Sequence, residues 1–152
     1  TISQQLAKQL FHKEKTRGIA RYTQKIKEWI IATRLEKQYT KEEILTMYFN
    51  IYDFNNNADG IRSAAKIYFD KEPKQLKIEE GAMLVGMFKN SALYNPVKNK
   101  EGVTNRRNVV LAQMAKNNYL TQEQKDSLQQ LPLKIKYTPE SHNDGIATYF
   151  RE

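Results

Sequence analysis

The chain has 152 residues, 39% of them hydrophobic, which is enough to bury one core but not two, so we expect a single domain. Its 25 Lys and Arg exceed its 17 Asp and Glu, and the formal net charge of +8 indicates an anionic partner: nucleic acid, anionic lipid headgroups or a pyrophosphate. The lack of cysteine excludes thiolate catalysis, Cys-ligated zinc and disulfides, and no apolar run approaches the roughly 20 residues that span a bilayer.

Two helices are predicted in the first part of the chain. Ile2, Leu6 and Leu10 recur at four-residue spacing, which is the period of one helix face, so a helix is expected from the start. A second helical stretch is expected from about Ala20 to Gln38. Its inner side is predicted to carry Ile26, Trp29, Ile30 and Thr33.

A third helix is predicted to begin after Thr40. Thr40 and Glu43 can form a capping box, in which each side chain accepts a hydrogen bond from the other residue's backbone N–H. Tyr39 and Ile44 can add a hydrophobic staple across this helix start. The helix is expected to end near Asn50, because a run rich in Asp and Asn follows.

The second half of the chain predicts four more helices. They are about 58–69, a mostly buried helix from about 76 to 88, 104–118, and 121–130 with Thr121 as cap and Gln124 at the third helical position. Pro73 suits the start of a turn between the first two, and loops are expected at Asn95 and Gly102.

The C-terminal part of the chain is predicted to leave this helical pattern. Residues 131–137 alternate apolar and polar residues like a short strand or an extended strap. The residues after them are polar and turn-forming. We therefore expect a nearly all-helical domain in residues 1–138 and a linker toward another domain in residues 139–152.

The first predicted helix has one polar, cationic side. On a helical wheel of about 100° per residue, Thr1, Gln5, Lys8 and His12 fall within one arc, opposite the apolar series. Such a stripe is either a solvated surface or a binding face. Spacing alone favours the solvated surface.

The second predicted helix carries a carboxylate among cations. Arg21, Lys25 and Glu28 follow at i, i+4 and i+7, and Lys27 lies beside Glu28. The cations can hold the carboxylate ionised or attract a phosphate. A single Glu in a basic helix can equally be an ordinary ion-pair partner.

Arg106 and Arg107 open a predicted helix, an unusual place for two cations because a helix N-terminus carries positive partial charge. They are expected to face either an acidic partner within the fold or a bound anion. His12 and His142 have no partners at metal-ligand spacing, and the chain has no Ser-His-Asp set and no Gly-rich phosphate loop. No metal site is predicted.

Four segments resemble, in order, the second to fifth signatures of the family fifty-one glycosyltransferases, the peptidoglycan glycosyltransferase domains of bifunctional class A penicillin-binding proteins. They are Thr1–Lys8, similar to Gly-Gly-Ser-Thr-Ile-Thr-Gln-Gln-Leu-x-Lys from its fourth residue, Lys25–Glu28, similar to the end of Arg-Lys-x-x-Glu, Lys41–Asn50, and Arg106–Leu111. Residues 59–65 with 68–69, and 91–96, are similar to connecting segments, and residues 142–152 resemble the linker to a transpeptidase domain. The resemblance implies an all-α, lysozyme-like glycosyltransferase domain.

The first signature of the family has no counterpart in these residues. Its pattern, Glu-Asp-x-x-Phe-x-x-His-x-Gly, supplies the Glu that is the family's general base. We therefore expect a domain truncated at its N-terminus and inactive on its own. Two further departures are Gln24, which stands where the third signature has Arg, and residues 55–57, which replace a Gly-rich turn with three Asn.

The resemblance implies polymerisation of lipid II into glycan chains, with inversion and release of undecaprenyl pyrophosphate. The expected partners are lipid II, the growing glycan chain and, through an upstream N-terminal part, the membrane surface; nucleic acid is not expected, and the oligomeric state is left open. The expected location is the periplasmic face of the bacterial inner membrane. No built-in cofactor is expected, although a divalent cation near the pyrophosphate would suit the chemistry.

The resemblance also assigns site residues. Glu28, the catalytic residue predicted here, matches the second glutamate of the family's site, where it would orient a lysine, bridge a divalent cation or help proton transfer. The fourth and fifth signatures are expected to hold the fold together rather than to touch substrate. The predicted substrate-binding residues are Thr1, Gln5, Lys8, Arg21, Lys25 and Lys27, with Arg21 chosen from helix phase alone.

Two alternatives from other functional classes stay open. The net charge also fits a basic helical nucleic-acid-binding module, although Glu is mixed among the basic residues and no recognition-helix motif is present. The signature residues can also serve only as packing and ion pairs in a non-catalytic scaffold. A groove shared by Lys8, Lys25, Lys27 and Glu28 would favour the enzyme over both.

Overall fold

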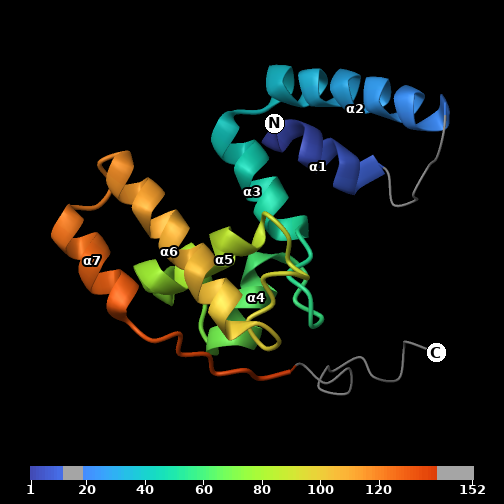
Figure 1. Ribbon diagram of the computed structural model, residues 1–152. Coiled ribbons are helices and arrows are strands. Elements are labelled where there is room, and N and C mark those ends of the chain that lie inside the picture. Colours follow the sequence, from blue (N-terminus) through green and yellow to red (C-terminus); the bar gives the residue numbers. More distant parts are fainter. Residues whose placement is uncertain (12–18, 140–152) are drawn as a thin grey trace. The chain divides into compact units, whose positions relative to one another are not determined.

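The computed structural model of the chain describes residues 1–11 and 19–139. These residues contain seven α-helices, one short 3-10 helix, and an isolated bridge between Asp53 and Asp59 in place of a sheet (Figure 1). The predicted all-α class is confirmed. The chain divides into two compact units, residues 1–52 and the residues from Asp53 onward, each with its own helix packing.

The first unit contains three helices: α1 (Ile2–Phe11), α2 (Ile19–Gln38) and α3 (Lys41–Ile51). α1 packs against both α2 and α3 (Figure 1). Its buried residues are Ser3, Leu6 and Ala7, and the two small side chains allow the close approach of neighbouring helices. Ile2 and Leu10 are exposed, so Leu6 is the one member of the predicted apolar series that this unit buries.

The packed side of α2 differs from the predicted one. Ile26, Trp29 and Ile30 are 54%, 57% and 51% exposed. Thr33 is exposed as well. The prediction that these four residues face inward is therefore wrong, and together with Tyr22 the three apolar ones form an exposed row that we call the α2 stripe: Tyr22, Ile26, Trp29 and Ile30.

The error has a physical cause, because α2 carries apolar residues on two opposite sides. The buried residues are Glu28 and Ala32, with Ile31 and Leu35 half-buried beside them. At about 100° per residue these positions lie on the far side of the helix from the α2 stripe. Apolar content alone cannot decide which of two apolar sides packs against α1 and α3, since that choice is made by tertiary contacts.

The start of α3 agrees with the predicted capping box. The Thr40 hydroxyl accepts from the Glu43 backbone N–H at 3.3 Å, and the Glu43 carboxylate accepts from the Thr40 backbone N–H at 2.8 Å. This bonding lowers the pKa of Glu43, because both contacts favour the ionised carboxylate. Tyr39 and Ile44, the predicted staple pair, line the same pocket of the first unit.

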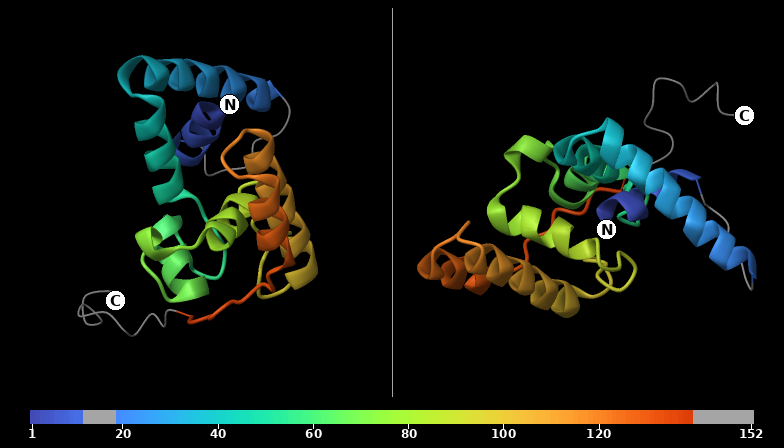
Figure 2. Two further views of the ribbon diagram at one scale, coloured as in Figure 1. Left: turned by 90° about the vertical axis from the view of Figure 1, so that its left-hand side faces the viewer. Right: turned by 90° about the horizontal axis from the view of Figure 1, so that it is seen from above.

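The second unit consists of α4 (Gly60–Phe69), the 3-10 helix η1 (Pro73–Gln75), α5 (Ile78–Met87), α6 (Lys100–Lys116) and α7 (Gln122–Gln130). α6 packs against α5 and α7, and the views in Figure 2 show α6 and α7 side by side. An apolar cluster fills the space at these helices, formed by Ala82, Leu111, Ala115 and Leu120. The predicted cap of the last helix is confirmed, because Thr121 accepts from the Gln124 backbone N–H.

α6 begins four residues earlier than predicted. Asn99 caps it, since its Oδ1 accepts from the Gly102 backbone N–H at 2.9 Å. Gly102, predicted to lie in a loop, is therefore in the first turn of the helix. The prediction missed the Asn cap and gave too much weight to the glycine.

The turn before α4 contains the three asparagines that replace a Gly-rich segment. Asn55, Asn56 and Asn57 have φ values of 62°, 56° and 63°, the left-handed region that Asn tolerates better than most residues. The Asn56 amide donates to the Tyr68 hydroxyl at 3.0 Å, and this hydroxyl donates to the Phe54 carbonyl at 2.7 Å. The turn is thus fixed by a buried tyrosine of α4.

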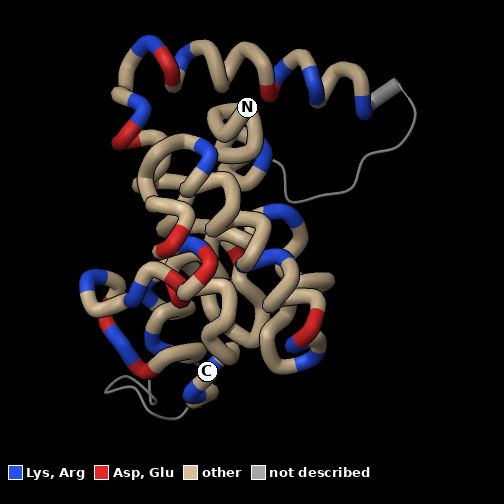
Figure 3. The backbone as a smooth tube through the Cα atoms, turned by 60° about the vertical axis from the view of Figure 1, so that its left-hand side comes forward, with Lys and Arg blue, Asp and Glu red and all other residues tan. Residues whose placement is uncertain are grey.

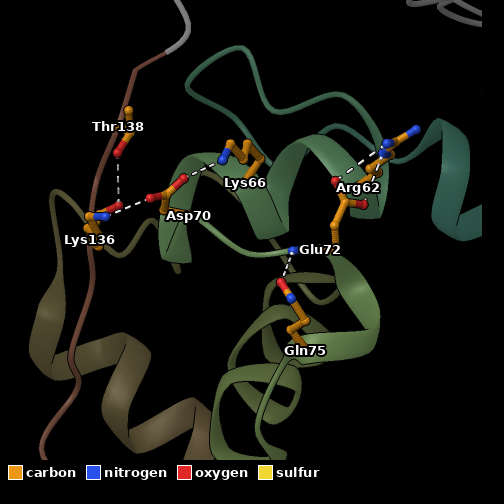
Figure 4. Close-up of polar contacts among 7 residues, drawn as sticks. All are labelled: Arg62, Lys66, Asp70, Glu72, Gln75, Lys136 and Thr138. Atoms are coloured by element: carbon orange, nitrogen blue, oxygen red, sulfur yellow. Dashed lines mark hydrogen bonds and ion pairs between the residues drawn. The ribbon is translucent and has the colours of Figure 1, made fainter.

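Residues 131–138 form an extended strap rather than a strand. Two backbone N–H groups of the strap donate to the end of α4, Lys136 to the Tyr68 carbonyl at 3.0 Å and Thr138 to the Ile67 carbonyl at 2.8 Å. The Lys136 ammonium also contacts the Asp70 carboxylate at 2.6 Å, as Figure 4 shows. The linker predicted for residues 139–152 lies outside the described residues, apart from Pro139.

Candidate active site

Glu28 lies in the middle of α2 and is 1% exposed. Two side chains of the preceding helical turn donate to its carboxylate: Lys25 Nζ at 2.5 Å and Gln24 Nε2 at 3.2 Å. The spacings of three and four residues place all three side chains on one side of the helix. Local spacing therefore accounts for these two contacts of the carboxylate.

Because the Glu28 carboxylate is buried, its hydrogen bonds contribute more to stability than they would in water. An unpaired carboxylate removed from water costs several kcal/mol, so the bonds from a lysine and an amide stabilise the buried group. The Lys25 side chain is 52% exposed while its partner is 1% exposed. Glu28 thus binds the Lys25 ammonium group, while the rest of the Lys25 side chain still reaches solvent. Of the three roles predicted for Glu28, this geometry fits the one in which it orients a lysine.

Gln24 also belongs to this cluster, although its residue type departs from the third signature of the family. It stands where the family signature has Arg, and its amide donates to Glu28 instead of adding a further charge. The Gln24–Glu28 spacing of four residues is a known hydrogen-bonding pair on helices and was the signal available in the sequence.

The predicted residues of α1 lie on its solvent side. Thr1, Gln5 and Lys8 are all exposed. The Thr1 hydroxyl accepts from the Gln4 backbone N–H at 3.3 Å, so this residue also caps the first turn of α1. The three residues keep the helical phase that was predicted for them.

Arg21 and Lys27, the two other predicted cations of α2, are exposed and form no ion pair with any described residue. α2 carries five basic and two acidic residues, and Figure 3 shows blue and red positions following each other along it. Within the described part of the first unit, the structure therefore joins Lys25 to Glu28. A groove shared with Lys8, Arg21 and Lys27 stays a prediction.

The donor set around Glu28 does not suit a resident metal ion. Within the described residues, no three His, Cys, Asp or Glu side chains lie close enough together to hold a metal. The one carboxylate of the cluster is bonded to an ammonium group, which a divalent cation would have to displace. His12 and His142 lie outside the described residues.

The arginines of the fifth signature lie inside α6, not at its start, so the predicted conflict with the helix N-terminus does not arise. Arg106 Nε donates to the Gly86 carbonyl at 3.3 Å, and its guanidinium lies 5.9 Å from the centre of the Tyr94 ring. Arg107 is 1% exposed and donates to the Gln129 carbonyl at 3.1 Å. These contacts bind α6 to α5 and α7, which agrees with a role in holding the fold together.

The family model described as Transglycosylase matches residues 1–115. The chain belongs to the transglycosylase family. This match confirms the resemblance to family fifty-one glycosyltransferases and disfavours the nucleic-acid-binding alternative.

Curated relatives agree with this assignment. The chain is 37% identical over 137 residues to penicillin-binding protein 1A of Aquifex aeolicus, covering 90% of this chain and 18% of that protein. It is 40% identical over 124 residues to penicillin-binding protein 2a of Streptococcus pneumoniae serotype 2, covering 82% of this chain and 16% of that protein. The chain therefore spans less than a fifth of the length of these relatives.

A solved structure supports the fold. The crystal structure of penicillin-binding protein 1A from Haemophilus influenzae matches with a TM-score of 0.57 and 24% identity, covering 90% of this chain and 17% of that one. At this identity the likeness concerns the fold alone. None of the helices in residues 1–11 and 19–139 combines the length and the apolar composition needed to cross a membrane.

Proposed function

We propose that the chain is part of a peptidoglycan glycosyltransferase domain that polymerises lipid II. The observation that carries the proposal is the buried Glu28 carboxylate holding Lys25 in a chain of the transglycosylase family. A buried carboxylate in the middle of a helix is costly unless it is paired, so its retention in α2 suggests a role beyond packing.

In the proposed reaction the 4-hydroxyl of the acceptor sugar attacks the anomeric carbon of the lipid-linked chain with inversion. The bond from that carbon to the pyrophosphate oxygen breaks, and undecaprenyl pyrophosphate leaves with the bonding electrons. The reaction needs a base at the hydroxyl and positive charge at the leaving group. The base is the glutamate of the family's first signature, which none of residues 1–152 supplies.

The cations of α1 and α2 are proposed to supply the positive charge at the leaving group. Lys25 is proposed to bind the leaving pyrophosphate, and Glu28 to position the Lys25 ammonium at 2.5 Å. An ammonium fixed before the reaction costs no reorganisation when charge develops on the leaving oxygen. Lys8, Arg21 and Lys27 are proposed as further phosphate ligands, because all three are exposed cations on helices that pack together.

Thr1 and Gln5 are proposed to line the donor site on α1. They lie one helical turn apart and both are exposed, so their polar groups can reach the same sugar. These uncharged side chains are proposed to orient the sugar by hydrogen bonds and add no positive charge to the site. Residues 1–138 are the proposed glycosyltransferase part, and residues 139–152 a linker toward a transpeptidase domain.

The proposed location is the periplasmic face of the bacterial inner membrane, with the α2 stripe against the lipid surface. Its four side chains, Tyr22, Ile26, Trp29 and Ile30, are between half and three-quarters exposed on a helix with five basic residues. An aromatic and aliphatic row beside cations is typical of helices that lie in the membrane interface.

Trp29 gives a direct test of this contact, because it is the one tryptophan of the chain. Addition of phosphatidylglycerol vesicles should shift its fluorescence to the blue, and Ile26→Asp should weaken vesicle binding. Val109→Asp, on an exposed apolar residue of α6, is the matched control and should bind normally. Equal loss in both variants, or no shift at all, would contradict contact through the stripe.

The catalytic proposal is tested in a longer protein that also carries the upstream signature. Glu28→Gln keeps the shape and removes the charge, so turnover should fall about 10²-fold while lipid II affinity changes little, since a mispositioned charge acts mainly in the transition state. Glu36→Gln, on an exposed carboxylate of the same helix, is the control. Unchanged turnover with a lowered thermal midpoint would give Glu28 a structural role instead.

A further inference from the structure

A pocket lies in the second unit, and none of its lining residues belongs to the proposed glycosyltransferase site. Its cavity is about 130 Å³, and three cations line it: Lys77, Arg107 and Lys134. Two carboxylates, Glu79 and Glu80, also line it. The size suits a small ionic group rather than a sugar.

Arg107 is buried with neutral partners. Its Nε and Nη2 donate to Asn108 Oδ1 at 3.1 and 3.0 Å, and Nη2 also donates to the Gln129 carbonyl at 3.1 Å. Among the described residues these bonds use Nε and Nη2, which leaves Nη1 as a donor for a ligand. No described carboxylate lies within 4.0 Å of the guanidinium. Burial lowers the pKa of Arg107, and the Glu79 charge acts in the opposite direction.

A guanidinium stays protonated in proteins even when its pKa falls, so the charge of Arg107 persists inside the fold. A buried charge whose partners are all neutral is destabilising unless a counter-charge is near. Glu79 supplies part of this compensation from a distance. An anion that enters the cavity would supply the rest.

The side chains that line the pocket carry more positive than negative charge, which favours binding of an anion. Glu80 is already engaged, because its carboxylate accepts from Lys71 Nζ at 2.7 and 2.8 Å and from the Lys77 backbone N–H at 2.8 Å. Glu79 is then the one remaining carboxylate on the wall against three cations. The side chains of Lys77 and Lys134 form no ion pair with any described residue, so both are available to close over a ligand.

The rest of the wall is apolar. Phe69 and strap residues 131–133 complete the lining of the pocket. Apolar side chains lower the local dielectric constant, which strengthens each ionic contact beside them. The strap that leaves the second unit therefore forms part of the pocket itself.

We propose that this pocket binds a small oxyanion, a carboxylate or a phosphate group, through Arg107 with Lys77 and Lys134. Arg107 belongs to the fifth signature, whose other contacts hold helices together. The proposal therefore gives this structural motif a role in ligand binding as well. The inference is independent of the proposed glycosyltransferase activity, because it uses no residue of that site.

The test is a titration of the whole chain with inorganic phosphate and, separately, with acetate, at constant ionic strength. Isothermal titration calorimetry measures binding, and the 15N–1H resonance of Arg107 Nε reports its place. Saturable binding below about 50 mM that moves this resonance supports the proposal, whether both anions or one of them binds; the pattern shows which oxyanion chemistry the pocket prefers. Absence of binding by both anions overturns it.

Variants on exposed or half-buried positions avoid the folding defect expected from replacing Arg107. Lys134→Gln should weaken binding about fivefold to tenfold, and Glu79→Gln should tighten it, because the carboxylate competes with the ligand. Lys98→Gln, on an exposed lysine of the same unit that does not line the pocket, is the control. If Glu79 instead turns inward to satisfy Arg107, phosphate will not bind the unchanged chain, which overturns the proposal. Equal affinity in Lys134→Gln and Lys98→Gln overturns it as well.

Discussion

In the first unit α2 buries the carboxylate of Glu28 and leaves Trp29 exposed, whereas in the second unit α5, α6 and the residues before α7 bury an apolar cluster around Leu111. A helix that only had to pack would place these side chains the other way round, because aromatic residues are usually inside and carboxylates outside. Local rules tend to be broken where a segment has a function beyond packing. The contrast therefore agrees with the proposal that α2 has a role beyond packing, and it shows that the cluster around Leu111 stabilises the second unit.

The largest expected effect is on the rate of lipid II polymerisation by residues 1–152. Residues 1–152 contain both units, but no residue assigned as the general base, so their lipid II polymerisation should be about two to four orders of magnitude slower than that of a protein carrying the upstream signature. Gel analysis of glycan chains from both proteins measures this. Comparable synthesis by the two would show that the base lies within the two units after all.

The contrast between the units predicts different costs of side-chain truncation. Leu111→Ala should lower the free energy of unfolding by about 2–5 kcal/mol, because it opens a cavity in the buried cluster. Trp29→Ala removes a larger side chain, yet it should cost less than about 1 kcal/mol, because that side chain is mostly exposed. Urea unfolding of both variants checks this, and equal losses would remove the distinction.

The turn of asparagines should depend on one hydroxyl. Tyr68→Phe removes the donor to the Phe54 carbonyl and the acceptor for the Asn56 amide, so it should cost about 1–3 kcal/mol of stability. Tyr22→Phe, on an exposed tyrosine of α2, is the control and should stay within about 0.5 kcal/mol of the wild type. A neutral Tyr68→Phe would mean that the turn is held by its backbone alone.

The smallest effect concerns the strap. Hydrogen bonds from Lys136 and Lys66 lower the pKa of Asp70 from 3.8 to about 2. Because the folded-state pKa is lowered, the contribution of this group is present above about pH 4 and is lost as the pH falls toward 2. The fall in thermal midpoint over this range should therefore be smaller in Asp70→Asn, a residue that also tolerates the left-handed φ of 53° at this position. Identical pH profiles would contradict it.

Elements defined by local hydrogen bonds could be predicted from the sequence. The capping boxes at Thr40 and Thr121 lie where their side chains indicated, because such motifs involve groups only three residues apart. The strap was foreseen as one of two alternatives, and its pairing with the end of α4 involves residues far away in the sequence. Local chemistry thus gave the starts of α3 and α7, whereas distant contacts placed the strap.

The candidate site was predictable only where it is local. The contact of Lys25 with Glu28 follows from helical spacing, as does the overlooked bond from Gln24. The side on which α2 packs was predicted wrongly, because the helix has apolar residues on both sides. The Gln129 carbonyl that binds Arg107 lies 22 residues further along the chain, and no sequence pattern indicates a backbone acceptor.

The central claim is that Glu28 acts in the reaction by holding Lys25, and a double-mutant cycle on turnover tests it most directly. In a protein that carries the upstream signature, the turnover of Lys25→Gln, Glu28→Gln and the double variant is measured with lipid II. If the two side chains act as one unit, each single change should lower kcat by a similar factor, and the double variant should be little slower than either. Factors that multiply in the double variant would contradict the account, because Glu28 would then contribute independently of Lys25.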